Sequence, residues 1–455
     1  MGLPEGLDAW VSGSSSIPSD FVGIECRAKP EIGSTRVLPR ESRGRRIALT
    51  VGRQNGSVEL GPVFWRLWTS TASSNLGDGI GKTGFPLLAV LLTRDPIQVS
   101  LLTAAFFLPW LVFALPSGAI IDRVDRSRAM TLANAGRALV VGSLALAVVT
   151  GVVALPMLYL AALFLGFAET IADGAYRAIL PSIVEKAQLD RGNATLQGTE
   201  LVADAFLGAP IASASFALAP AAPFVLGAVG FGLSATVAAT LPPTPATDGP
   251  TTPLRLGALR TEMAEGVRFL ARHEILRGLL LIGGIGALAN SGFTAIAVLW
   301  ALEVLGVPEA LFGVLILSLA FGGVVGTLTV GALTARVGRA NALRLAVGAM
   351  AGSSLAMAFV TNALIAAILW SVASWAVIVW NVLTMSLRQQ LIPEALFGRV
   401  QGAWRTVVYG TIPLGSVVGG VVAATFGLTA PLVVLGAVQG LLLVFGWRLM
   451  GRAAS

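Results

Sequence analysis

Cysteine and histidine are nearly absent from this chain. The single cysteine, Cys26, can form neither an internal disulfide nor a cysteine-built metal site. The single histidine, His273, cannot supply a histidine metal cluster, and its isolation argues against a Ser-His-Asp triad. The sequence therefore predicts no resident metal, no cofactor and no enzymatic activity.

Charge is also scarce. Only 12% of the 455 residues are charged and 55% are hydrophobic, whereas a soluble protein carries about 25% charged residues. The mean hydropathy is +0.80. This composition excludes a soluble multidomain enzyme and places most of the chain in lipid. Only three of the 31 basic residues are lysine, which is typical of a G+C-rich bacterial genome.

Apolar runs fill most of the sequence after residue 60. A bilayer-spanning helix needs about 20 predominantly apolar residues, and twelve segments meet this length. The predicted spans are 63–92, 98–121, 129–153, 156–180, 195–218, 222–241, 275–302, 309–333, 340–361, 363–390, 403–426 and 428–449. An amphipathic helix over 257–272 separates the first six from the last six.

The spans divide the chain into four segments. We expect a disordered cytoplasmic tail over 1–60, a six-helix bundle over 61–241, a cytoplasmic linker over 242–272 and a second six-helix bundle over 273–455. The tail has no apolar run of the kind found in a signal peptide. A start codon assigned too early is the alternative explanation for it.

The loop charges predict an orientation. Basic residues gather in the loops on the side of the N-terminal tail: Arg123, Arg126, Arg128, Lys186, Arg191, Arg255, Arg260, Arg268, Arg272, Arg336, Arg339, Arg388, Arg399, Arg448 and Arg452. The opposite loops carry only Arg94, Asp95, Glu303 and Glu309. The positive-inside rule then predicts a protein of the cell inner membrane with both termini in the cytoplasm. It also explains the net charge of +7 without a nucleic acid partner.

A short charged loop occurs once in each half. Gly118-Ala-Ile-Ile-Asp122-Arg123-Val-Asp125-Arg126 is matched by Gly331-Ala-Leu-Thr-Ala335-Arg336-Val-Gly338-Arg339, with equal spacing of the glycines and arginines. A loop that recurs between apolar helices indicates a duplicated membrane transporter.

With this loop, the sequence over about 61–450 resembles the major facilitator superfamily. Residues 118–128 are similar to that family's signature G-x-x-x-D-R-x-G-R-R between helices two and three, with Asp125 in place of the second glycine. The phrases Ser74-Asn-Leu-Gly-Asp78-Gly79, Leu387-Arg-Gln-Gln-Leu-Ile-Pro393 and Gly398-Arg-Val400 resemble the branch that contains enterobactin exporters and macrolide-efflux proteins.

The resemblance implies a gate at the signature loop. Gly118 would permit close packing of helix two on helix eleven. Asp122, with Arg123 and Arg126, would form a charge network that latches the cytoplasmic side closed, which biases a two-state equilibrium. Orientation by positive charge alone is the alternative. The branch further implies export of small molecules driven by the proton gradient.

Ionisable residues inside the predicted spans are the strongest functional signal, because a charge at bilayer depth needs a partner or a cavity. The first half carries Asp78, Lys82, Arg137, Glu169, Asp173, Arg177, Glu200 and Asp204. We expect Asp204 and Glu169, then Asp78, then Glu200 and Asp173, to handle protons, with a carboxylate beside Arg137 as a switch. Three of these acids have an alternative: Asp78–Lys82 and Asp173–Arg177 as i,i+4 structural pairs, and Glu200 reaching the cytoplasmic surface.

The second half carries fewer acids in its spans and more aromatic and amide side chains. We expect Asn290, Trp375, Asn381 and Arg405 to contact substrate. Trp375 could instead contribute only to packing.

Two motifs in the first half have simple interpretations. Gly77-Asp-Gly-Ile-Gly-Lys-Thr83 has three residues between glycines where a phosphate-binding loop needs four, and no strand precedes it, so we expect no nucleotide. Gly208-Ala-Pro210 predicts a bend in the fifth span.

Taken together, the sequence predicts an all-α membrane protein of twelve transmembrane helices in two pseudo-symmetric six-helix bundles. The expected function is proton-coupled efflux of a small organic molecule such as a drug, macrolide or siderophore by alternating access, by a monomer in the bilayer. An importer or lipid flippase on the same fold and a non-transporting sensor or scaffold are the alternatives.

Overall fold

The computed structural model describes residues 60–121, 124–244 and 256–452, with the side chains of 114–120, 256–263 and 395 left out. The tail predicted over 1–60 therefore lies almost wholly outside the described residues. Every described element is helical.

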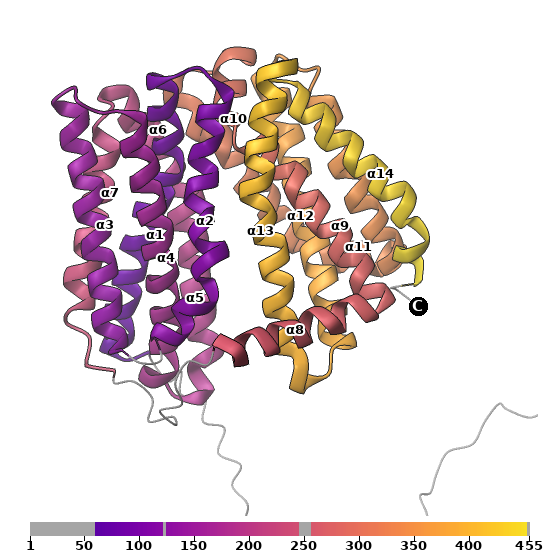
Figure 1. Ribbon diagram of the computed structural model, residues 1–455, viewed down its shortest axis with the longest axis horizontal. Helices are drawn as coiled ribbons and strands as arrows, with labels where there is room; N and C mark the ends of the chain where they lie inside the picture. The colour runs from indigo at the N-terminus through magenta and orange to yellow at the C-terminus, as the bar shows by residue number, and fades with distance from the viewer. Residues whose placement is uncertain (1–59, 122–123, 245–255, 453–455) are drawn as a thin grey trace, which may run out of the picture. The chain divides into compact units, whose positions relative to one another are not determined.

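The first half contains the helices of six predicted spans, coloured indigo to magenta in Figure 1. Their bounds are α1 Pro62–Leu92, α2 Pro96–Ile121, α3 Arg126–Val149, α4 Leu155–Ile183, α5 Leu189–Glu200, η2 Leu201–Gly208, α6 Ala209–Leu218 and α7 Ala222–Ala238. A short turn, η1, covers Lys186–Gln188. The elements α5, η2 and α6 follow one another without a break and form the fifth span, in which η2 is π-helical.

The second half repeats this order after the linker helix α8, Leu256–Arg272, in red to yellow in Figure 1. Its elements are α9 Glu274–Thr294, α10 Ala297–Leu299, η3 Trp300–Val304, α11 Glu309–Met357, α12 Ala363–Leu391, α13 Glu394–Phe426 and α14 Ala430–Arg452.

Within the described residues, nine helical segments are long and apolar enough to cross a membrane. The other three predicted spans have local explanations. α1 carries Asp78 and Lys82 in mid-helix, and α7 has only 17 residues. α11 has 49 residues, about 74 Å at 1.5 Å per residue, which is far more than a bilayer of about 30 Å. Gly338, at φ 79°, breaks it into two spans at the position that the repeated loop predicted.

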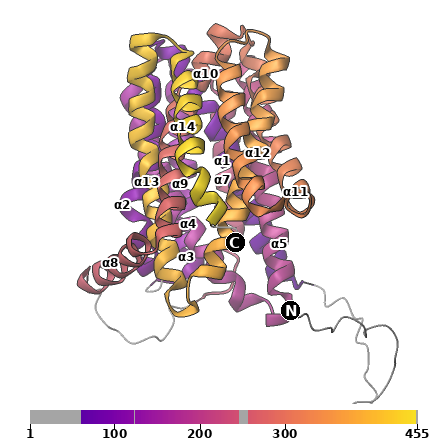
Figure 2. The same cartoon turned by 90° about the vertical axis from the view of Figure 1, so that its right-hand side faces the viewer.

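Contacts between the halves gather at the end of the molecule where α1, α6, η3 and α13 finish. At this end, which we name the sealed end, the Arg94 guanidinium lies 3.3 Å from the Glu303 carboxylate. The backbone N–H of Gly313 in α11 donates to the Ser213 hydroxyl of α6 at 2.6 Å. α2 and α13 lie side by side in both views (Figure 1, Figure 2). The largest cluster of buried apolar residues also draws on both halves.

Gly313 allows α6 and α11 to approach closely, because a Cβ there would overlap the Ala209 carbonyl oxygen. We expect Gly313→Ala to push the helices apart. Overpacking costs about 1–3 kcal/mol, which shifts a two-state equilibrium about 5- to 150-fold. Disulfide cross-linking of cysteines placed at Arg94 and Glu303, with Cys26 replaced by alanine, should therefore be about 5- to 150-fold slower.

The matched control for this experiment is Gly331→Ala on the same helix, where an added Cβ meets no atom within 4 Å. Equal cross-linking rates in the Gly313 and Gly331 variants would contradict the role assigned to this contact.

The linker helix α8 packs on the second half, running across the direction of α13 (Figure 1). A Cβ at Gly266 would lie 2.5 Å from the Arg399 carbonyl oxygen, so α8 meets α13 backbone to backbone. The Glu265 carboxylate binds the Arg399 guanidinium at 2.5 Å. The His273 ring accepts from the Leu276 N–H and caps α9.

Candidate functional site

Asp78 of α1 pairs with Arg137 of α3 inside the first half. The carboxylate accepts a hydrogen bond from the guanidinium, and the two side chains are 8% and 1% exposed. A buried ion needs a partner because each charge loses its hydration. Asp78 is therefore the carboxylate beside Arg137 that the sequence analysis could not identify.

Three neighbours complete the environment of Arg137. Its guanidinium donates to the Ser74 hydroxyl at 3.0 Å and to the Asn134 amide oxygen at 3.2 Å. It also lies 4.2 Å above the ring of Phe231 in α7, within the range of a cation–π interaction. These contacts hold the arginine between α1, α3 and α7.

Lys82 links two further carboxylates. Its ammonium lies 2.6 Å from the Asp204 carboxylate of η2 and 3.9 Å from the Glu169 carboxylate of α4. The lysine is 40% exposed, whereas Glu169 is 11% exposed, and one Glu169 oxygen has no hydrogen-bond partner among the described residues. The i,i+4 pair between Asp78 and Lys82, considered as an alternative, is not formed, since each binds a different helix.

Lys82 was missed as a site residue in the sequence analysis, where it served only as a possible structural partner of Asp78. The signal was present, because Lys82 is one of only three lysines and lies inside an apolar span. A lysine at that depth requires an acidic partner or a cavity.

Close helix packing positions Asp204. A Cβ at Gly79 of α1 would overlap the backbone of Asp204, and a Cβ at Gly208 would lie 2.6 Å from the Gly79 backbone. The π-helical stretch η2, which contains Asp204, directly precedes the predicted bend at Pro210. Single π-helical turns inside α-helices are frequent at functional sites. The local geometry therefore presents the Asp204 carboxylate to Lys82.

Two cavities adjoin this charged cluster. One of about 470 Å³ is lined by Asp78, Lys82 and apolar side chains that include Phe85 and Phe224. The other, about 260 Å³, is lined by Lys82 and Asp204 and by residues of α9, α11 and α12. Lys82 lies on both, so one ammonium connects the interior of the first half with the boundary between the halves.

Asp173 and Glu200 lie outside this cluster. Asp173 is 4.0 Å from Arg177 on the same helix, in the i,i+4 arrangement considered as the structural alternative. Glu200 is the last residue of α5, about one turn before Asp204, and is partly exposed.

Asn290 and Asn381 line one cavity of the second half, about 200 Å³ in volume. Arg405 does not line it. Its guanidinium lies 5.6 Å from the ring of Tyr409, and the side chain is exposed. The structure thus brings two of the four residues expected in the second half together.

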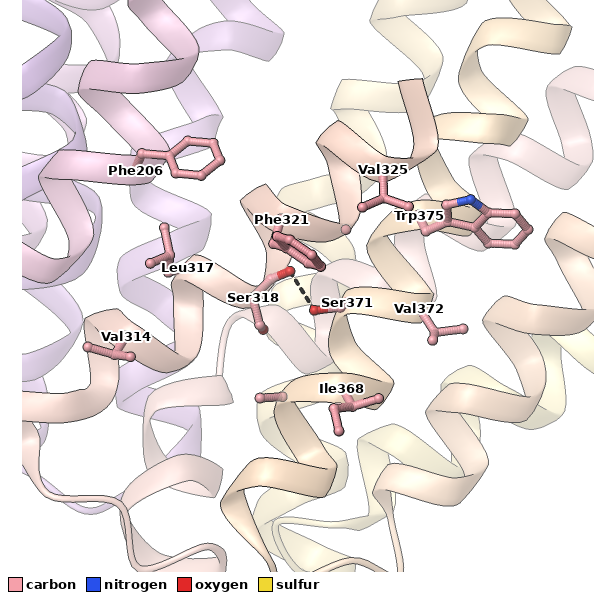
Figure 3. A pocket seen from close by; sticks show the side chains of 12 residues that line it. Phe206, Val314, Leu317, Ser318, Phe321, Val325, Ile368, Ser371, Val372 and Trp375 are labelled. Carbon is pink, nitrogen blue, oxygen red and sulfur yellow. Dashed lines mark hydrogen bonds between the residues drawn. The ribbon is translucent and has the colours of Figure 1, made fainter. Parts of the chain in front are cut away.

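Trp375 lies in a different groove, about 720 Å³ in volume, between the fifth span, α11 and α12 (Figure 3). Its indole N–H donates to the Thr329 hydroxyl at 2.9 Å. Phe206 contributes from the first half, and Phe321 at the groove is 62% exposed. In a membrane, an exposed apolar face of this kind contacts acyl chains.

Of the four residues predicted to form the gate, Arg126 is described in full. It begins α3, and its guanidinium donates to the Ala178 carbonyl of α4 at 3.1 Å. Gly118 lies in α2 close to its end, and Asp122 and Arg123 lie outside the described residues. The proposed latch therefore remains a prediction.

The departure from the signature at Asp125 has a structural reason. Its carboxylate accepts from the Arg128 N–H at 2.8 Å and caps α3. In the second half, Arg339 donates to the Gln390 side chain of α12 at 2.8 Å. Arg126 and Arg339 thus both bind the fourth span of their own half.

Sequence comparison identifies relatives with this architecture. Residues 67–415 match the model of the Major Facilitator Superfamily. A multidrug efflux pump Tap of Mycobacterium bovis is 28% identical over 392 residues, which cover 82% of this chain and 90% of that protein. An uncharacterised MFS-type transporter of Mycobacterium tuberculosis is 32% identical over 186 residues, and that alignment spans 40% of each chain.

Solved structures share the fold at low identity. The nucleoside transporter NupG has a TM-score of 0.66 at 14% identity, covering 86% of this chain and 100% of that one. A bacterial homologue of the iron transporter ferroportin has a TM-score of 0.67 at 16% identity, covering 86% and 98%. The family match spans most of the chain, and the helix order and the repeated loop agree with it. This chain therefore belongs to the major facilitator superfamily and is a secondary transporter with an all-helical, multi-pass membrane fold.

Proposed function

We propose that this protein exports a small organic molecule from the bacterial cytoplasm in exchange for protons. The observation that carries the proposal is the Lys82–Asp204–Glu169 cluster, in which Lys82 lines two cavities and Asp204 lines one of them. A carboxylate that exchanges an ammonium partner for a proton or a cationic substrate couples the two ligands, because only one of them can neutralise it at a time.

The net charge of this cluster, taken together with the neighbouring Asp78–Arg137 pair, favours a cationic or neutral substrate. Asp78, Glu169 and Asp204 supply three acids, and Lys82 and Arg137 supply two bases. Fully ionised, these groups carry a net negative charge, so an anionic siderophore fits less well than a cation. The relationship to a multidrug efflux pump supports export of drug-like molecules, in keeping with the branch to which the motifs point.

The positive-inside pattern supports an orientation for this cycle. With the arginine-rich loops on the cytoplasmic side of the cell inner membrane, the sealed end faces outward. The Arg94–Glu303 and Gly313–Ser213 hydrogen bonds join the two halves at that end. The conformation is then the one that loads substrate from the cytoplasm, and Asp122, Arg123 and Arg126 would latch the opposite conformation. One copy of the chain contains the whole pathway.

The proposal is tested with inverted membrane vesicles that hold a fluorescent reporter of the proton gradient. Tetraphenylphosphonium, a macrolide and a siderophore are added in turn. At least one should collapse the gradient in the wild type, and the effect should fall about 10²-fold in Asp204→Asn or Glu169→Gln. A folded protein that binds these compounds yet never moves protons would overturn the proposal.

A lipid flippase is the second candidate, and the groove in Figure 3 favours it. This groove joins Phe206, which is two residues from Asp204, to exposed apolar side chains of α11 and α12. An amphiphile could therefore enter from the bilayer. Translocation of a fluorescent phospholipid in reconstituted liposomes distinguishes this activity from export. Uptake and a non-transporting sensor are further outcomes of the vesicle assay.

A further inference from the structure

The repeat allows positions in the two halves to be compared. Counted from the first residues of α1 and α9, Asp78 corresponds to Asn290. One turn earlier on each helix, Ser74 corresponds to Gly286. The acid and the hydroxyl of the first half are thus replaced by an amide and a hydrogen.

The same comparison applies to the arginine and the aromatic ring above it. Counted from the arginines of the repeated loop, Arg137 corresponds to Met350. Counted from the first residues of α7 and α14, Phe231 corresponds to Gln439. The second half therefore has no counterpart of the buried ion pair.

These four replacements coincide with a cavity. The counterparts in the second half all line the space of about 200 Å³: Gly286, Asn290, Met350 and Gln439. In the first half, the guanidinium of Arg137 fills the corresponding position between three helices. In the second half, Gly286 and Met350 stand at the positions of Ser74 and Arg137 and line open space.

Two tryptophans form the walls of this cavity. A Cβ at Gly283 would lie 3.9 Å from the indole nitrogen of Trp380 and 3.8 Å from the ring edge of Trp404. Arg388 lies 4.2 Å from the centre of the Trp404 ring and donates to the Gln401 side chain at 2.8 Å. Arg388, which is itself fixed by its hydrogen bond to Gln401, therefore holds the Trp404 ring in place.

Three amides and the Thr384 hydroxyl are among the polar groups of the cavity. Asn290, Asn381 and Gln439 line it, and the Gln439 amide oxygen accepts weakly from the Ser354 hydroxyl at 3.4 Å. Among the described residues that line it, none is charged. Such a lining favours an uncharged ligand, because a charge would have no partner.

The cavity lies near the two cavities that adjoin Lys82. Asn290 lies one helical turn, about 5.4 Å, before Thr294 on α9. Thr294 lines both cavities that adjoin Lys82. One face of α9 therefore runs from the amides to the charged cluster.

We propose that this cavity in the second half binds an uncharged aromatic group that carries hydrogen-bond donors and acceptors. Trp380 and Trp404 enclose the ring and the amides bind its polar atoms. A cavity of about 150 Å³ accommodates benzene, so 200 Å³ suits one ring with substituents. The inference deepens the proposed function, since it assigns this group to one end of the transported molecule and a cationic end to the first half.

The test measures binding to the purified full-length protein, apart from any transport. The probes are indole, nicotinamide and chloramphenicol as uncharged aromatics, and tetraphenylphosphonium as a cation without hydrogen-bonding groups. Gly286→Leu places a larger side chain in the cavity, and the added Cβ itself meets no atom within 4 Å. It should weaken binding of at least one uncharged probe about tenfold or more. Gln439→Leu should weaken it about fivefold by removing one hydrogen bond.

The control is Gly352→Leu, an exposed glycine with the same open surroundings that does not line the cavity. It should bind every probe as the wild type does. Tetraphenylphosphonium binding should fall in Asp204→Asn and be unaffected by Gly286→Leu. If no uncharged probe binds, or if Gly286→Leu and Gly352→Leu bind equally, the inference is wrong. If Gly286→Leu weakens binding of an uncharged probe and Gly352→Leu does not, but the protein moves no protons, the proposed function is refuted and the inference about the cavity stands.

Discussion

Replacing Arg137 by methionine is expected to destabilise the protein more than almost any other single substitution. The change leaves Asp78 as a buried acid, 8% exposed, without its cationic partner. Breaking a buried pair from one side costs about 3–5 kcal/mol. For a domain of this half's size, that cost corresponds to a fall in Tm of roughly 6–20 °C, measured by thermal unfolding in detergent.

The double variant Asp78→Asn with Arg137→Met should recover much of this loss. It removes both charges and installs the pair that the second half carries at Asn290 and Met350. Neutral residues of similar volume often replace a buried ion pair at little cost.

Arg94→Met is the control for the single variant, because it breaks the ion pair with Glu303, in which both side chains are exposed. Exposed pairs contribute about 0–1 kcal/mol, so its Tm should change little. A double variant no more stable than Arg137→Met would show that the penalty does not come from the unpaired charge.

The second large effect is expected for Lys82→Met, on transport. The substitution removes the ammonium shared by Asp204 and Glu169 and leaves both carboxylates without that partner. A hydrogen bond to a charged group contributes about 1.5–3 kcal/mol, which partial exposure reduces. Since about 1.4 kcal/mol is tenfold, proton-coupled transport in inverted vesicles should fall at least about tenfold. Tetraphenylphosphonium binding should stay equal or increase.

Lys186→Met serves as the matched control, since Lys186 is exposed in the short turn η1. Lys82→Arg should restore part of the activity by keeping the charge. Undiminished coupled transport in Lys82→Met would remove the shared ammonium from the mechanism.

Local properties of the chain were predictable. The length of each apolar run depends only on neighbouring residues, and the described helices overlap the predicted spans, with nine helical segments long and apolar enough to cross a membrane. The repeated loop located the break at Gly338, because a charged loop and a glycine at positive φ both interrupt a helix. The scarcity of charge showed which residues inside the spans needed partners.

The partners themselves were not predictable from spacing. Asp78 and Lys82 share a helix face at i,i+4, yet Asp78 binds Arg137 and Lys82 binds Asp204. The buried Arg137 guanidinium has lost its hydration and requires an acidic partner, whereas the Lys82 side chain is 40% exposed and keeps part of its hydration. The long lysine side chain can also reach a neighbouring helix.

The membrane class, the duplication, the helix order and the set of intramembrane charges follow from local composition and spacing, and so could be read from the amino-acid sequence. Tertiary packing fixes which acid meets which base, that Trp375 lines an outer groove, and that Asn290 and Asn381 share a cavity. These outcomes depend on how helices far apart in the sequence approach one another. At Gly79 and Gly208, for example, two backbones come within reach only because both residues lack a side chain.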